Sequence, residues 1–406
     1  MRKAAKAFSK SKLSDTGDID IAKLSSYKFD DNIFRKVMLT PKGKSHGLVL
    51  LLDKSGSMSD NMAGSIEQVL VLAMFCRKVN IPFIVYGFGD SIEASVCDAG
   101  ITLYDYHQQK RQECFSRKDG ELSLGTVFLR EYLNSNMANS EFSQSIRNLI
   151  VLKKAFESGR WGLGKPESED LSNTPLTQAI IATAGIMKEF RKRNNLDMTS
   201  LVIVHDGDSD HCGYYLKTIT ENWINGPKTV QRGMSFSIKN ENVIFRDSKN
   251  KYESRIVSTE QDALLSVTLD WFRKTTNSKI FGFFLANNNL RTLKNVLYNR
   301  YVDETGKALS QVYSDGRKTG LSDNFDLIRS DLIKKMRSDK FIVSNIPGYN
   351  SFYLVMGGDE LKTTDEGIEI EGKVTSGKLK NAFMKMNKRK AINRVLVSKF
   401  IQGIAA

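Results

Sequence analysis

Short apolar runs constrain the fold of this chain more than any other feature of its sequence. Each is about as long as one strand, and they are GLVLLLD (47–53), IPFIVYGFGD (81–90), TSLVIVHDGDSD (199–210), SKIFGFFLA (278–286) and SFYLVMG (351–357). A strand that is buried on both faces is a continuous apolar run, whereas a half-exposed strand alternates apolar and polar residues. The runs therefore predict the central strands of a sheet that is covered on both sides.

Segments with helical patterning separate these runs. Apolar residues recur at helical spacing in 59–78, and the spacing predicts further helices at 140–158, 175–194, 259–274, 289–300 and 323–337. Strands that alternate with helices build βαβ units, which give a parallel sheet. We therefore expect an α/β fold with a doubly wound, mostly parallel sheet flanked by helices, of the Rossmann-like kind. The piece MSFSIKNENVIFRD (234–247) has a hairpin-like pattern.

The length of the chain allows one large domain with additions. Its 406 residues, of which 40% are hydrophobic, can bury a sizeable core. We expect this α/β domain at 45–360, with long insertions at about 91–170 and 211–277. A basic N-terminal extension (1–44) and a basic C-terminal tail (361–406) are expected to flank it.

The net charge of +14 is confined to the two ends of the chain. Residues 1–13 contain five Lys or Arg and no acid, and residues 373–406 contain nine and no acid, so the tails carry the whole excess. Basic tails can bind nucleic acid or an acidic protein surface, or serve only as solvated ends. Nucleic-acid binding is not favoured, because the tails lack interleaved aromatic residues and any known motif. The apolar spacing in 379–400 fits a docking helix or a helix that packs on its own domain.

Cysteine spacing and hydropathy indicate in which cellular compartment the protein is expected. The four cysteines show no CxxC spacing, so we expect free thiols in a reducing environment. No apolar segment follows the basic N-terminal residues, and no apolar run approaches the roughly 18 residues of a membrane span. We therefore expect a cytoplasmic protein without membrane association, and association with a virion is the alternative.

Oxygen-bearing side chains follow two of the apolar runs, where each run ends. The first run leads into Asp53-x-Ser55-x-Ser57, and the third leads into Asp206. Thr174, in SNTPLTQAI, lies just before an expected helix. Open α/β sheets bind ligands at the carboxyl ends of their strands. Hydroxyls and carboxylates without His or Cys suit Mg²⁺, or another hard divalent cation such as Mn²⁺ or Ca²⁺. Asp208 and Asp210 have weaker claims, as outer groups or solvent-exposed acids.

These pieces resemble the metal-ion-dependent adhesion site (MIDAS) of the von Willebrand factor A (VWA) domain family. That family has D-x-S-x-S after its first strand, a threonine in a later loop, and an aspartate that ends the fourth strand, usually before glycine. The same order is kept here by Asp53, Ser55 and Ser57 in DKSGSM, Thr174 in NTPL and Asp206 in HDGD. The resemblance covers about residues 45–210 well and 278–360 more loosely. It implies that the hydroxyls contact a metal directly and that the acids often act through water.

Within this family the chain is most similar to the VWA subunit of cobalt chelatase (CobT type) and to relatives that work with MoxR-type AAA+ ATPases. The similarity rests on LLDKSGSM, the long segment before Thr174, TPLTQAI with KEFRK after it, and the late FYLVMGGDEL. CobT-like proteins usually carry an acidic region before the VWA domain, and this chain has none. Related proteins also occur in large tailed phages.

The resemblance implies a role in protein binding. A site of this kind leaves one coordination position open, which an Asp or Glu of a partner can complete. We therefore expect a non-catalytic adaptor that binds a partner's acidic residue through Mg²⁺, with a MoxR-type AAA+ ATPase in a remodelling or chelatase-like complex. The alternative is a structural component of a larger assembly, such as a virion, docked by its VWA module and basic tails.

Enzymatic interpretations of the first motif fit less well. A phosphorylated Asp53 of the HAD type would need a second acid two residues later, where Ser55 stands. Ser57 lacks the G-x-S-x-G elbow of a hydrolase nucleophile. Because no nucleophile, base and orienting group can be assembled from the chain, we expect no catalytic site of its own, although a chelatase-type accessory role stays open.

Two further motifs are weak candidates for binding sites. GRWGLGK (159–165) matches a phosphate loop, but Pro166 replaces the Ser or Thr and no apolar strand leads into the loop. His205 ends a strand and is expected to pack in the core. His211 with Cys212 is a weak candidate for a soft metal.

Overall fold

The computed structural model describes residues 12–19, 34–39, 45–78, 80–90, 127–158, 164–209, 214–223, 226–235, 243–256, 263–306, 308, 310–312, 318–320 and 325–358. The predicted docking helix in 379–400 lies outside these residues. So do Asp210, His211 and Cys212, and most of the glycine-rich motif at 159–165.

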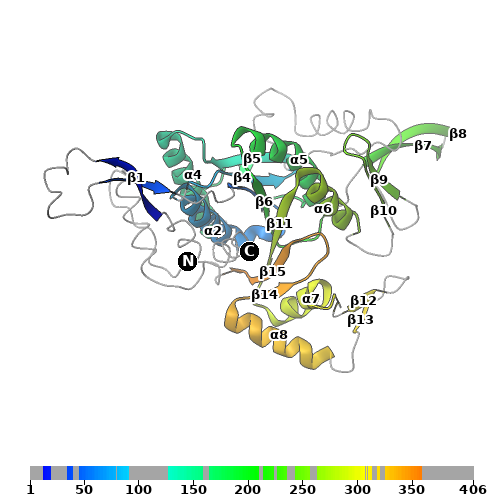
Figure 1. Ribbon diagram of the computed structural model, residues 1–406. Coiled ribbons are helices and arrows are strands. Elements are labelled where there is room, and N and C mark those ends of the chain that lie inside the picture. The colour runs from blue at the N-terminus through cyan, green and yellow to red at the C-terminus, as the bar shows by residue number, and fades with distance from the viewer. Residues whose placement is uncertain are drawn as a thin grey trace.

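A seven-stranded sheet forms the centre of the molecule, with the strand order β14-β15-β11-β6-β3-β4-β5 (Figure 1). Its strands are β3 (His46–Asp53), β4 (Phe83–Gly89), β5 (Phe128–Asn134), β6 (Met198–His205), β11 (Ser278–Ala286), β14 (Phe341–Ser344) and β15 (Ser351–Met356). The five inner strands run parallel, whereas β5 and β14 pair antiparallel with their neighbours at the two edges. The expected mostly parallel α/β sheet is therefore confirmed.

The central strand β3 is buried on both faces. Leu48, Leu50 and Leu52 belong to one hydrophobic cluster, whereas Val49 and Leu51 belong to another. None of these side chains is more than 1% exposed. Successive side chains of a strand point to opposite faces, so the continuous apolar run is explained by helices on both sides of the sheet.

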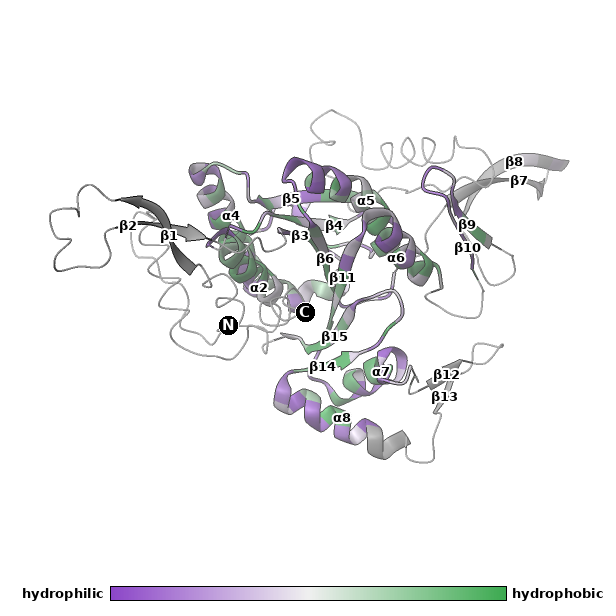
Figure 2. Ribbon diagram, in the orientation of Figure 1, coloured by the Kyte–Doolittle hydropathy of each residue, from purple (hydrophilic) through white to green (hydrophobic). Residues whose placement is uncertain are grey.

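Helices cover both faces, as a doubly wound fold requires. The helices α2 (Ser59–Lys78) and α4 (Asn139–Glu157) pack on one face, and α5 (Leu176–Arg193) and α6 (Ala263–Thr276) pack on the other (Figure 1). A third cluster joins α7 (Leu290–Arg300) and α8 (Phe325–Asp339) to β11, β14 and β15. Colouring by hydropathy shows apolar residues along the strands and polar residues on the outer helix surfaces (Figure 2). In the described ranges, no helix has the length and apolarity needed to cross a bilayer.

Several strands lie outside the predicted elements. The edge strands β5 and β14 are two of these, and the rest form two-stranded hairpins. The hairpins pair β1 (Lys12–Ile19) with β2 (Phe34–Leu39), β7 (Tyr214–Trp223) with β8 (Gly226–Ser235), β9 (Val243–Asp247) with β10 (Tyr252–Ile256), and β12 (Ser310–Val312) with β13 (Lys318–Gly320). The segment 234–247, with its hairpin-like pattern, is divided between two of them, because it ends β8 and forms β9.

The order of the strands places a crevice beside β3. The chain leaves β3 through α2 to reach β4 on one side, and it returns through α5 to β6 on the other side. Because α2 and α5 lie on opposite faces, the connections diverge at the carboxyl ends of β3 and β6. Such a switch point is where doubly wound sheets bind ligands. Asp53 ends β3 and Asp206 follows β6, so two predicted site residues lie at this point.

Candidate metal centre

The carboxylate of Asp53 organises the loop that follows β3. Its Oδ1 atom accepts a hydrogen bond from the backbone N–H of Ser55 at 2.9 Å, and its Oδ2 atom accepts one from the Ser55 hydroxyl at 3.0 Å. An aspartate that binds the backbone two residues later makes a local turn. Asp53 is fully buried and Ser55 is 2% exposed. The D-x-S spacing therefore folds Ser55 back over the end of the strand.

Two serine hydroxyls connect Asp53 to Asp206. The Oγ atoms of Ser55 and Ser57 are 3.0 Å apart, and the Ser57 hydroxyl donates to Oδ1 of Asp206 at 2.5 Å. Ser57 and Asp206 are 149 positions apart in the sequence. The fold thus joins the ends of β3 and β6 through a line of four oxygen-bearing side chains.

This line contains more contacts than hydroxyl protons. It has three oxygen–oxygen contacts, namely Asp53–Ser55, Ser55–Ser57 and Ser57–Asp206. A serine has one proton to donate, and an ionised aspartate has none. With both carboxylates ionised, two hydroxyl protons serve three contacts, so one of the three contacts has no proton of its own.

Thr174 lies at the same edge of the sheet. A methyl group placed on Gly207 would lie 3.4 Å from Oγ1 of Thr174 and 3.6 Å from Oγ of Ser57. The backbone brings Thr174 there, because Gly56 N–H donates to the Ser172 carbonyl at 2.7 Å and Ser172 N–H donates to the Lys54 carbonyl at 3.0 Å. The structure therefore places all five predicted ligand residues at one edge.

Asp206 is held by a residue that the sequence patterns did not single out. The side-chain amide of Asn61 donates to Oδ2 of Asp206 at 2.9 Å, and its carbonyl oxygen accepts from Gly358 N–H at 2.7 Å. Burial raises the pKa of Asp206 above its ordinary value, and the hydrogen bonds from Ser57 and Asn61 oppose this rise. Asn61 stands four positions after Ser57, and that spacing is the one sequence signal that points to it.

Asp90, directly after β4, is a second residue without a predicted role. Its carboxylate accepts hydrogen bonds from the Ser172 hydroxyl, from Asn173 N–H at 3.0 Å and from the Asn173 side-chain amide at 2.7 Å. It therefore fixes the segment that leads into Thr174. The signal available in the sequence was an acid at the end of the second apolar run.

The other polar residues near β6 do not join the oxygen line. Asp208 forms an ion pair with Arg300, a buried residue whose guanidinium lies 4.7 Å from the centre of the Phe284 ring. The expected packing of His205 is confirmed, because its ring meets the Phe284 ring edge-on at 5.3 Å. Burial and the charge of Arg300 lower the pKa of His205 to about 3. The neutral ring donates from Nδ1 to the Gly207 carbonyl at 3.0 Å.

The chemistry of the oxygen line suits a hard cation. In the part of the chain that the structure describes, no three His, Cys, Asp or Glu side chains gather as a metal site, so the candidate centre relies on two carboxylates and three hydroxyls. Octahedral Mg²⁺ binds oxygens at about 2.1 Å, which puts adjacent ligands about 3 Å apart. The 3.0 Å between the Ser55 and Ser57 hydroxyls fits that spacing. Asp53 is buried and Ser57 is exposed, so the centre is open to solvent on the Ser57 side.

Comparisons with known proteins do not show a family for this chain. No known protein family and no curated protein matches it. Among solved structures it has a low similarity to the pilus adhesin SpaC from Lactobacillus rhamnosus GG in its open conformation, with 11% identity and a TM-score of 0.29. A second structure of that adhesin gives 11% identity and a TM-score of 0.30. The alignments cover 75% of this chain and only 33% and 34% of the adhesin. A similarity this low indicates neither the fold nor the function of the chain.

Proposed function

We propose that this chain is a VWA-type adaptor that holds Mg²⁺ with Asp53, Ser55, Ser57, Thr174 and Asp206 and thereby binds an acidic residue of a partner protein. The observation that carries the proposal is the proton deficit of the oxygen line. Because two protons serve three contacts, the hydroxyl oxygens of Ser55 and Ser57, which lie 3.0 Å apart, have lone pairs to offer. A cation beside them accepts those lone pairs and offsets the charge of two neighbouring carboxylates.

The chain's own residues would orient the centre before any ligand arrives. Asp53 fixes Ser55 through two hydrogen bonds, Asn61 fixes Asp206, and Asp90 fixes the segment before Thr174. When bound, Mg²⁺ supplies a position that a carboxylate from outside can fill, in a charge-assisted contact. Ser57 and Gly56 are exposed, so a partner's side chain can approach from that side.

The partner proposed is a AAA+ ATPase of the MoxR type, in a remodelling or chelatase-like complex. This part of the proposal is supported by the sequence resemblance in DKSGSM, TPLTQAI and FYLVMGGDEL. A carboxylate-bearing loop on such an ATPase would fill the remaining position. The adaptor would then hold the ATPase only while the metal is present.

Titration of the protein with MgCl₂ by calorimetry tests the metal centre. Asp206→Asn and Ser57→Ala should each abolish or strongly weaken binding, because each removes an oxygen or a charge from the line. Asp208→Asn and Ser59→Ala are matched controls, because Asp208 pairs with Arg300 and Ser59 is an exposed residue at the start of α2. Equal Mg²⁺ affinity in all four variants would refute the centre.

Affinity purification with and without EDTA tests the partner. A MoxR-type ATPase that is identified by mass spectrometry with Mg²⁺, and that is lost with EDTA and in Ser57→Ala, supports the adaptor. Recovery in a stoichiometric particle that is indifferent to EDTA would replace the adaptor with the structural role in a larger assembly.

A further inference from the structure

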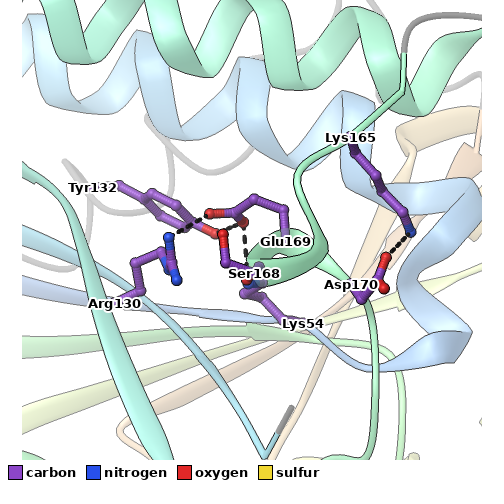
Figure 3. Close-up of polar contacts among 7 residues, drawn as sticks. All are labelled: Lys54, Arg130, Tyr132, Lys165, Ser168, Glu169 and Asp170. Carbon is purple, nitrogen blue, oxygen red and sulfur yellow. Dashed lines mark hydrogen bonds and ion pairs between the residues drawn. The ribbon is translucent and has the colours of Figure 1, made fainter. Parts of the chain in front are cut away.

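A buried ion pair lies directly beside the candidate centre. Lys54, between Asp53 and Ser55, is 1% exposed and is among the largest fully buried side chains in the described residues. Its Nζ atom lies 3.0 Å from Oε2 of Glu169, and it donates to the Ser168 carbonyl at 2.9 Å. Figure 3 shows Lys54 and Glu169 meeting beside the short helical turn Glu167–Glu169. An ammonium group is rarely buried unless it is paired.

Glu169 is the hub of this buried group. Its Oε1 atom pairs with Arg130 at 3.2 Å, and its Oε2 atom accepts a hydrogen bond from the Tyr132 hydroxyl at 2.6 Å (Figure 3). Burial and the neighbouring carboxylate raise the pKa of Tyr132 well above its ordinary value, so the hydroxyl keeps its proton and donates. Both carboxylate oxygens are therefore used, and they tie residues of β5 to the loop after β3.

The space for this group is created by a glycine of β4. A methyl group on Gly87 would lie 2.6 Å from Cε2 of Tyr132 and 3.0 Å from Cδ of Lys54. The two side chains thus cross over the bare backbone of Gly87. Any larger residue would push them apart, so the buried route of Lys54 to Glu169 is a built feature of the fold.

Lys54 contacts the same segment at two points. Its backbone carbonyl accepts from Ser172 N–H at 3.0 Å, while its side chain holds Ser168 and Glu169. We name residues 168–174, which end in Thr174, the threonine segment. We propose that the Lys54–Glu169 ion pair is a positioning element that, together with Asp90, sets the threonine segment against the loop of Ser55 and Ser57.

An ion pair can position the threonine segment more sharply than an apolar contact can. An apolar contact would allow the segment to slide, because the hydrophobic effect has no direction. A buried ammonium–carboxylate pair is held at one distance, because a shift leaves two charges desolvated and apart. Lys54 is thus the first "x" of D-x-S-x-S, and it aligns the remote Thr174 with Ser55 and Ser57.

Glu169→Gln tests this inference, with Tyr132→Phe as the matched control. Both variants weaken the contacts of Glu169, but only Glu169→Gln removes the charge that pairs with Lys54 and Arg130, and of these two cations only Lys54 lies in the loop after β3. Hydrogen exchange of the Gly56 and Ser172 amides, in metal-free protein, reports how the two segments are joined. We expect these amides to exchange about tenfold faster or more in Glu169→Gln and to stay protected in Tyr132→Phe, because breaking a buried pair exposes an unpaired charge.

Mg²⁺ affinity is the second readout, and it rests on the proposed function. Outer-shell partners of metal ligands typically contribute about 10- to 100-fold in affinity, so Glu169→Gln should bind Mg²⁺ at least tenfold more weakly than Tyr132→Phe. Should Glu169→Gln lose its cooperative unfolding transition, Glu169→Asp replaces it, because aspartate keeps the charge and withdraws it by one methylene.

The outcomes separate this inference from the proposed function. Equal exchange in Glu169→Gln and Tyr132→Phe would overturn the positioning role, as would faster exchange in Glu169→Gln with unchanged Mg²⁺ affinity. If the wild-type protein binds no Mg²⁺, the proposed function fails, and the exchange comparison still decides the role of the ion pair.

Discussion

The neighbouring strands β3 and β4 each lead into an aspartate, and the two aspartates organise the same edge of the sheet differently. Asp53 accepts both of its described hydrogen bonds from Ser55, two residues later. Asp90 accepts three hydrogen bonds from Ser172 and Asn173, more than 80 residues away in the sequence. One carboxylate shapes its own loop, whereas the other captures a remote segment.

The difference separates a proposed metal ligand from a residue that supports the site. Asp53 belongs to the oxygen line, so its charge would bear on a cation. The charge of Asp90 faces hydroxyl and amide donors. Asp90 therefore acts by holding the segment before Thr174 in position. Substitutions that remove the charge, the hydrogen bonds or both should therefore change Mg²⁺ affinity to different degrees at the two strand ends.

Asp53→Ala should have the largest effect. We expect a loss of Mg²⁺ affinity of about 100-fold or more, beyond the effect of an outer-shell partner. The free energy of unfolding should also fall by about 1–3 kcal/mol, because the buried N–H of Ser55 loses its acceptor. Asp53→Asn keeps an acceptor, so it should lose Mg²⁺ binding with a smaller loss of stability. Calorimetry and chemical denaturation measure the two quantities, and strong Mg²⁺ binding by Asp53→Asn would contradict the assignment of Asp53.

Asp90→Ala should weaken Mg²⁺ binding by about tenfold, as expected for an outer-shell partner, because Thr174 is no longer held in place. The effect should act through Thr174. In a double-mutant cycle, Thr174→Ala should therefore cost much less affinity in the Asp90→Ala background than in the wild type. Additive losses would show that Asp90 acts on the centre by another route.

Asp90→Asn should have a smaller effect than Asp90→Ala. The amide carbonyl can still accept from Asn173 N–H, while the amide nitrogen can no longer accept from the Asn173 side chain. We expect a loss of about fivefold or less in Mg²⁺ affinity, equivalent to one hydrogen bond of about 1 kcal/mol. A loss as large as that of Asp53→Asn would mean that the charge of Asp90 matters to the metal.

Lys165→Gln should have the smallest effect. Lys165 forms a partly exposed ion pair with Asp170, inside the threonine segment, at 3.1 Å. Exposed pairs contribute about 1 kcal/mol or less to stability, so the free energy of unfolding should change little and Mg²⁺ affinity should not change. A clear drop in affinity would show that the buried contacts of Lys54 and Asp90 do not suffice to hold the segment.

A contrast between buried and exposed strands explains which parts of the fold the sequence could predict. The runs that became β3, β4, β6, β11 and β15 are buried on both faces, so their composition alone marks them as strands. The edge strand β5, FLREYLN, is mostly half-exposed and carries charges, so it lacks that signal. The edge strand on the opposite side of the sheet, β14, has only four residues. Edge strands therefore escaped a prediction that depends on burial.

The candidate centre divides in a similar way. The Asp53–Ser57 loop is local, so its spacing is visible in the sequence. The contacts of Asn61, Asp90, Glu169 and Arg300 link residues that lie far apart in the chain. Periodicity and spacing do not show which remote residues such contacts join. The proposed ligands were thus predictable as a pattern, and the remote contacts that hold them became visible only through the fold.

The amide of Asn61 has a consequence for the time at which the centre forms. One end of this side chain holds Asp206, and the other end accepts from the backbone of Gly358, which is 297 positions further along the chain. During synthesis, β3 and β6 emerge long before β15, and until then the Asn61 carbonyl lacks this donor. The centre therefore reaches its final form only after residue 358 has left the ribosome, so a truncated chain would present the motif without its full support.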